Sequence, residues 1–137
     1  MKKMALVFVV VSVGALAAVT PAMSCDTSLF DVSDWRASAR EDGRHIRTDM
    51  EVDLVYRGER TYRMIHAATL FSDALGNALV SVSIERDQTV VPGEVFTSSG
   101  AFVGSDSRIT SINRDDVRSR TCVWSIVYDD GTVEEFE

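Results

Sequence analysis

Apolar and polar residues alternate with a period of two along several short stretches of the chain. The clearest stretch runs from Val80 to Ile84, where apolar residues are separated by serines. A strand with one face in a core and the other in water has this pattern, because successive strand side chains point to opposite faces. Further runs of β-compatible residues cover 52–56, 61–71, 95–97, 101–103, 109–112, 121–128 and 133–136. The pattern therefore predicts seven or eight short strands.

Turn-forming residues separate these runs at intervals of about ten residues. They include DALGN at 73–77, Pro92-Gly93 and DDGT at 129–132, where glycine accepts the positive φ of a tight turn. Many short strands with tight turns are typical of a sandwich of two antiparallel sheets. We therefore predict an all-β, antiparallel β-sandwich of about seven strands over residues 51–137.

The strand expected over residues 121–128 carries the chain's second cysteine. Strict alternation places Cys122, Trp124, Ile126 and Tyr128 on one face of that strand. The charged stretch before it, residues 113–120, is interpreted as a loop.

Residues 25–50 show no alternation. Leu29, Val32, Trp35 and Ala39 recur at three- and four-residue spacing, and Ser33 is a suitable helix cap. We expect a short helical or irregular N-terminal arm here. Trp35 is either an exposed contact for a partner or the residue that docks this arm on the sheet, and we favour docking because large aromatic side chains usually find apolar cover.

The first residues have the layout of a secretory signal peptide. Lys2 and Lys3 precede an apolar stretch that Pro21 ends, and Ala22 and Ser24 have the small-residue spacing of a cleavage site. The apolar stretch is shorter than the roughly 20 residues of a membrane-spanning helix. We therefore expect residues 1–24 to be removed and the protein to be exported, periplasmic or secreted, with Cys25 as its first mature residue.

Two fates are open for Cys25. An even number of cysteines in an exported protein indicates a disulfide, here Cys25 with Cys122. The alternative is lipidation, because Ala22-Met23-Ser24-Cys25 resembles a bacterial lipobox in its serine before the cysteine, although alanine stands where leucine is usual. Only lipidation at Cys25 would tether the protein to a membrane.

Charge narrows the class of partner. Both lysines lie in the expected signal peptide, so the remaining chain has twelve arginines against 21 acidic residues and a net charge of −9. Nucleic acid requires a basic footprint, and anionic lipid also attracts cations, so we expect neither as a partner. Arg114, Arg118 and Arg120 could receive a carboxylate or phosphate, but we expect them to be neutralised by neighbouring Asp115 and Asp116.

The stretch LFSDALGNALVSVSIERDQTVVPGE, residues 70–94, resembles the middle of small immunoglobulin- or fibronectin-like domains of exported bacterial proteins and lipoproteins. The shared scheme is an aromatic strand ending in Asp73, a turn at Gly76, an alternating strand and the Pro92-Gly93-Glu94 turn. The resemblance covers about residues 61–136. It implies an immunoglobulin-like sandwich and no common reaction.

Candidate chemistry is sparse. His45 and His66 do not form a metal-ligand cluster, and no serine lies in a Gly-x-Ser-x-Gly elbow. We expect no catalytic, cofactor-binding or metal-ligating residues. The expected function is that of a non-catalytic accessory or binding module that recognises a protein or another component of the bacterial envelope. The alternatives are a small secreted hydrolase with a site assembled from loops, and a structural subunit that assembles through its N-terminal arm.

Overall fold

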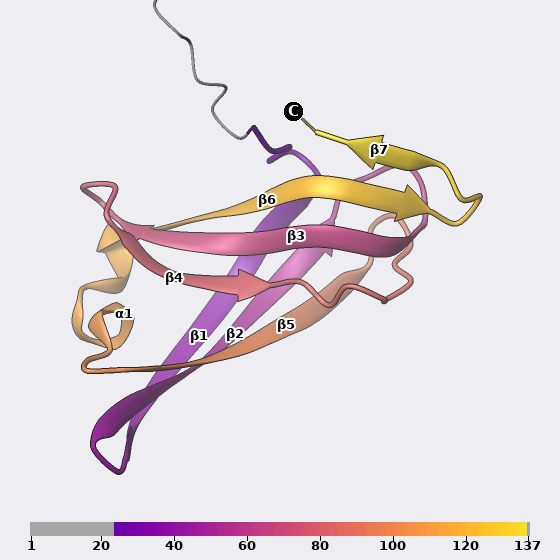
Figure 1. The fold of residues 1–137 in the computed structure, drawn as a ribbon. Helices are drawn as coiled ribbons and strands as arrows, with labels where there is room; N and C mark the ends of the chain where they lie inside the picture. The colour runs from indigo at the N-terminus through magenta and orange to yellow at the C-terminus, as the bar shows by residue number, and fades with distance from the viewer. Residues whose placement is uncertain (1–23, 137) are drawn as a thin grey trace, which may run out of the picture.

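Two antiparallel β-sheets pack face to face in the computed structural model, which describes residues 24–136 (Figure 1). The expected signal peptide, apart from Ser24, lies outside the described residues. One sheet has three strands in the order β1-β2-β5, and the other has four in the order β4-β3-β6-β7. The prediction of an all-β, antiparallel two-sheet architecture with seven strands is confirmed.

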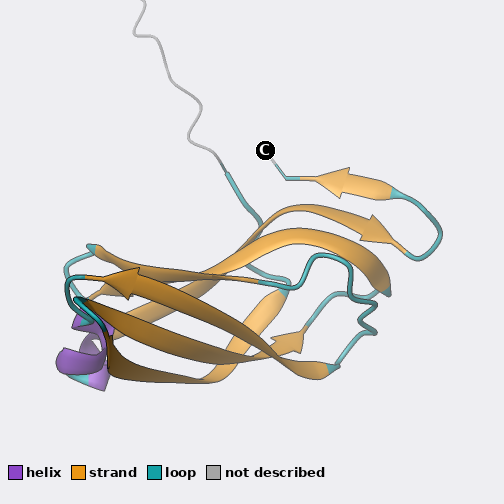
Figure 2. Ribbon diagram, turned by 60° about the horizontal axis from the view of Figure 1, so that its bottom comes forward, coloured by secondary structure: helices purple, strands orange, loops and turns teal. Residues whose placement is uncertain are grey.

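The three-stranded sheet consists of long strands. They are β1 (Phe30–Asp42), β2 (His45–Tyr56) and β5 (Val95–Gly104). The other sheet consists of β3 (Tyr62–Asp73), β4 (Ala78–Ser83), β6 (Val117–Tyr128) and the short β7 (Val133–Glu135). The helical turns α1 (Arg108–Ser111) and η1 (Arg114–Asp116) connect β5 to β6 at one end of the sandwich (Figure 2).

The prediction of a helical or irregular arm before residue 51 is wrong. Most of this segment forms β1 and the first half of β2, which pair with each other from Phe30 to the turn at Gly43. A bulge between Val32 and Asp34 shifts the register, so the apolar positions Val32 and Trp35 are three residues apart on an extended strand. This spacing imitates the helical period that the sequence suggested.

A second bulge changes which residues of β6 face the core. Val123 pairs with Ala67 but Ser125 pairs with His66, so Trp124 is an extra residue in β6. Val123, Ile126 and Tyr128 therefore belong to the core, whereas Cys122 does not. The expectation that Cys122 shares a face with Ile126 is wrong, because strict alternation does not hold across a bulge.

Two shorter predictions for the segment between β5 and β6 also need correction. Residues 108–111, interpreted as part of a strand, form the helical turn α1, in which Ile109 is buried. The predicted loop after Ile112 contains η1 and the beginning of β6, which already starts at Val117.

Aromatic side chains from both sheets fill one end of the core. The rings of Phe30, Tyr56 and Tyr62 lie with centroids 5.0 to 6.2 Å apart, and all three side chains are almost fully buried. Gly58 allows this packing, because a Cβ at that position would collide with the ring of Tyr56. At the other end of the core, Phe71 from β3 meets Trp35 from β1 with a centroid distance of 5.5 Å.

Candidate functional site

The outer face of the four-stranded sheet carries Arg86, Arg118 and Arg120, three of the five arginines that form no ion pair among residues 24–136. The other two are Arg44, in the turn between β1 and β2, and Arg63. We call the outer surface of β4, β3 and β6, together with Arg86 from the segment after β4, the arginine face. It contains two hollows, one at each end of the strands.

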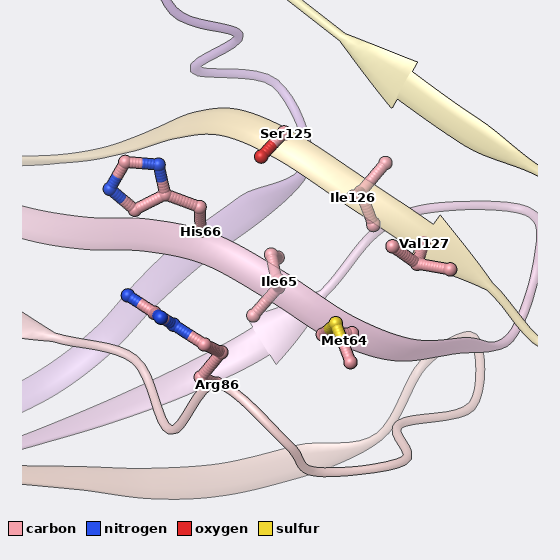
Figure 3. A pocket seen from close by; sticks show the side chains of 7 residues that line it. All are labelled: Met64, Ile65, His66, Arg86, Ser125, Ile126 and Val127. Atoms are coloured by element: carbon pink, nitrogen blue, oxygen red, sulfur yellow. The ribbon is translucent and has the colours of Figure 1, made fainter.

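The first hollow has a volume of about 270 Å³ and lies at the Met64 end of β3 (Figure 3). His66 and Ser125 are register partners on β3 and β6, and Arg86 extends beside His66 from the neighbouring segment. Met64 and Val127 supply an apolar rim. The hollow therefore combines a guanidinium, an imidazole and a hydroxyl with exposed apolar surface.

The second hollow has a volume of about 540 Å³ and lies near the other end of the same strands. Arg118 and Arg120 stand two residues apart on β6, so their side chains leave the sheet on the same side. Their register partners on β3 are Ser72 and Leu70, and Ser81 of β4 lies beyond Leu70. The lining is again cationic, hydroxyl-bearing and partly apolar.

Neither hollow is lined by an acidic side chain among the described residues. Arg118 donates one hydrogen bond of 2.9 Å, to the backbone carbonyl of Asp115. Arg86, Arg118 and Arg120 form no ion pair within residues 24–136. The seven arginines that do form ion pairs are Arg36, Arg40, Arg47, Arg57, Arg60, Arg108 and Arg114.

The outer face of the three-stranded sheet shows the opposite arrangement. Arg36 of β1 donates to Glu51 at 2.9 Å and to Asp53 at 2.7 Å, and Thr97 donates to the same Asp53. The hydrogen bond from Arg36, followed by that from Thr97, lowers the pKa of Asp53 to about 2. On this sheet Arg36, Arg40 and Arg47 are neutralised by carboxylates of β2, and Arg44 in the β1–β2 turn is the one arginine of residues 30–56 without an ion pair. The arginine face carries three such cations, Arg86, Arg118 and Arg120.

The arginine cluster singled out in the sequence is divided between two surfaces. Arg114 does not pair with Asp115 or Asp116 but reaches Asp34 at 2.6 Å. Arg118 and Arg120 leave β6 on its outer side, and neither forms an ion pair with Asp115 or Asp116, although Arg118 reaches the backbone carbonyl of Asp115. The predicted local neutralisation is therefore wrong within the described residues, because β6 begins directly after Asp116 and its pleat fixes the direction of these side chains.

Trp35 lies against the protein itself. Its ring contacts Phe71 edge to face, and the guanidinium of Arg114 stacks over it at 4.0 Å from the ring centroid. Arg114 also donates to the carbonyl of Trp35 at 2.9 Å. This geometry fits the docking interpretation, with Trp35 joining β1 to the opposite sheet.

Replacement of Trp35 by alanine should lower the free energy of unfolding by about 1 to 3 kcal/mol, because a half-buried ring and its stacking partners are lost. Urea unfolding of Trp35→Ala and Trp35→Phe measures this, and the phenylalanine variant should recover most of the loss. Unchanged stability of Trp35→Ala would contradict the docking interpretation and favour the alternative, in which Trp35 is a contact for a partner.

Both cysteines are joined to each other. The Cys25–Cys122 disulfide spans 97 positions, and it lies beside a short backbone pairing of Asp26 with Val123. The sulfur of Cys25 in this bond has no valence left for a thioether, so disulfide and lipidation are alternatives at this atom. Cys122 pairs with Ala68 in the sheet register, which places the bond on the outer side of the sheet between the two hollows.

One of the two histidines lies near a hydroxyl that the sequence did not single out. Ser125 lies opposite His66 on the adjacent strand, a proximity that the bulge at Trp124 creates. The ring of His66 packs on Trp124 with a centroid distance of 4.9 Å. The hydrogen bonds of residues 24–136 do not include one between Ser125 and His66, and His45 lies apart from both at the start of β2.

Two kinds of feature are absent from the described part of the chain. Residues 24–136 contain no cluster of three or more histidine, cysteine or acidic side chains arranged to hold a metal ion. They also contain no helix that is long and apolar enough to cross a membrane.

Comparison with known proteins shows a structural likeness at low sequence identity. No family model matches the sequence, and no curated protein matches it. The chain is similar to a solved structure described as the X-ray structure of Northeast Structural Genomics Consortium target SoR45. The two share 11% sequence identity, the match covers 80% of this chain and 83% of the other, and the TM-score is 0.45.

Proposed function

We propose that this protein is a non-catalytic, exported binding module of the bacterial envelope, and that it recognises an acidic segment of another protein on the arginine face. The observation that carries the proposal is the set of unpaired arginines Arg86, Arg118 and Arg120 beside two hollows free of acidic lining. A guanidinium binds a carboxylate through two parallel hydrogen bonds. The apolar surface around Leu70 and Met64 would receive the uncharged side chains of the same segment.

The net charge of −9 that the chain carries without residues 1–24 does not oppose such a contact at short range. Charges farther apart than about 8 Å are largely screened at physiological ionic strength. Electrostatic attraction on a bound acidic partner would therefore come mainly from the three arginines of the arginine face. The neutralised outer face of the three-stranded sheet would attract the partner less. Repulsion from the remaining surface would disfavour acidic proteins that fit the hollows poorly.

The strand order supports an immunoglobulin-like assignment within the sandwich class. The chain crosses between sheets after β2, after β4 and again after β5, so that three strands face four. Domains of this architecture commonly bind through an exposed sheet face, an edge or loops.

Export is supported by the chemistry of the Cys25–Cys122 bond. A disulfide persists in oxidising compartments such as the periplasm and is rare in the cytosol. The bond is also the feature that distinguishes a diffusing module from a lipoprotein tethered through Cys25.

A titration with a synthetic glutamate-rich peptide, followed by amide chemical shifts in two-dimensional NMR, tests the proposed site. We expect the shifted amides to lie in β3, β4 and β6 and near Arg86. The double variant Arg118→Gln/Arg120→Gln should weaken binding by about tenfold or more, because two charge-assisted hydrogen-bonding groups are lost.

The matched control removes the same charge from paired arginines. The double variant Arg36→Gln/Arg47→Gln should leave the affinity for the peptide nearly unchanged, since both side chains already hold carboxylates. Equal losses in the two double variants would show that only net charge matters, and shifts confined to β1, β2 and β5 would place binding on the other sheet.

A further inference from the structure

Strand β5 forms one edge of the three-stranded sheet and lacks the features that usually protect an edge. Its ten residues, VFTSSGAFVG, include no charged residue and no proline. Its register with β2 runs from Val95 to Gly104 without a bulge. Val95 and Val103 are 64% and 60% exposed. A long, regular and uncharged edge is a template for pairing with another strand.

The other three edges of the sandwich differ from β5. The opposite edge of the same sheet, β1, carries a bulge and six charged residues. In the second sheet, the edge strands β4 and β7 have only six and three residues. Charges, bulges and short length are the usual protections against strand pairing, and β5 alone among these edges has none of them.

The backbone groups of β5 that point away from β2 can be identified. Tyr56 donates a backbone hydrogen bond of 3.0 Å to Glu94, so the polar groups of residue 94 point toward β2. Alternate residues of an antiparallel strand direct these groups to opposite sides. The N–H and C=O groups of the odd-numbered residues from Val95 to Val103 therefore point to the free edge, where no hydrogen bond of the described residues uses them.

We propose that β5 pairs with β5 of a second copy of this chain, antiparallel about a two-fold axis at Ser99. The sequence of the strand is complementary to itself in this register. Val95 lies opposite Val103 of the second copy, and Phe96 lies opposite Phe102. Each pair occurs twice, as a two-fold interface requires. The odd-numbered residues then exchange about ten backbone hydrogen bonds across the axis.

Charge does not prevent a second copy from approaching at this edge. Two copies from Cys25 onward, each with a charge of −9 (12 arginines against 21 acidic residues), repel each other, so they can approach closely only where the surface is neutral. In the proposed register the facing strands bring no like charges together. The result is one continuous six-stranded sheet, and the arginine faces of both copies remain free. The inference is thus independent of the function proposed above.

Sedimentation equilibrium of the oxidised protein that begins at Cys25, over a range of concentrations, tests the pairing. We expect a reversible dimer with a dissociation constant in roughly the micromolar range, since strand pairing buries a modest area. Ser99→Lys places two like charges opposite each other at the axis and should raise the dissociation constant about tenfold or more. An equimolar mixture of Ser99→Lys and Ser99→Glu should restore dimers that contain one copy of each.

Ser38→Lys provides the matched control, because Ser38 is an exposed serine on the opposite edge strand. It should leave the dimer unchanged, and all variants should unfold at nearly the temperature of the unsubstituted protein. A protein that stays monomeric at every concentration, including one whose β5 instead accepts a strand of a different protein, would overturn the proposal. So would a dimer insensitive to Ser99→Lys, or a mixture of the two Ser99 variants that fails to recover it.

Discussion

Loss of the Cys25–Cys122 disulfide is expected to reduce the free energy of unfolding by about 4 to 5 kcal/mol. The bond closes a loop of 97 residues, and cross-linking so long a loop removes much of the entropy of the unfolded chain. It also fixes the segment at Asp26, which pairs with Val123 at the edge of β6. Urea unfolding of the double variant Cys25→Ala/Cys122→Ala, compared with the oxidised protein, measures the effect.

A reductant supplies the control for this comparison. It should destabilise the unsubstituted protein to about the level of the double variant, and it should not change the stability of the double variant. Equal stability of the oxidised protein and the double variant would mean that the bond contributes little to folding. In that case Cys25 would be available for lipidation without loss to the domain.

Replacement of Phe71 by alanine is expected to have an effect of similar size, a loss of about 3 to 5 kcal/mol. Phe71 is 1% exposed, and its ring meets Trp35 of the opposite sheet. Its removal leaves a cavity between the sheets. It also removes part of the lining of the second hollow of the arginine face, to which Phe71 contributes. The midpoint and slope of urea unfolding give the change in stability.

Phe71→Leu distinguishes lost volume from lost aromatic contact. Leucine fills much of the space, so this variant should lose less than about half of what the alanine variant loses. A Phe71→Ala protein as stable as the unsubstituted one would contradict the assignment of Phe71 to the contact between sheets.

The strands that alternate without interruption were predictable from the sequence. Val82 and Ile84 are buried as expected, and Val52, Leu54 and Tyr56 are fully buried on one face of β2. The glycines also predicted turns correctly, as at Gly131 between β6 and β7, where φ is positive. The sandwich class followed from these elements, because many short amphipathic strands must bury their apolar faces against a second sheet.

The strand β1 and the direction of the β6 side chains were not predictable from the sequence, because both strands contain bulges. The bulge in β1 converts the spacing of Val32 and Trp35 from two to three, and the one in β6 moves Ile126 to the face opposite Cys122. A bulge depends on the partner strand, which a local pattern does not contain. For the same reason the arm was mistaken for a helical or irregular segment.

The candidate site could be predicted only in part. Arg118 and Arg120 were singled out, but their neighbours in sequence suggested neutralisation, whereas the pleat of β6 turns them toward Leu70 and Ser72. Arg86 and Ser125 carried no local signal, since they join the face through strand pairing across long separations in sequence. The absence of charge in residues 95–104 was visible in the sequence, but that β5 is an edge strand was not.

Site-specific photo-crosslinking in the bacterial envelope tests most directly whether the arginine face is the binding surface. A photoreactive amino acid at Ser81 lies beside the second hollow, and one at Ser38 lies on the other sheet. We expect the photoreactive residue at position 81 to form an adduct with an acidic segment of another protein, and we expect Arg118→Gln/Arg120→Gln to abolish this adduct. No adduct at Ser81, or the same adducts from Ser81 and Ser38, would contradict this expectation.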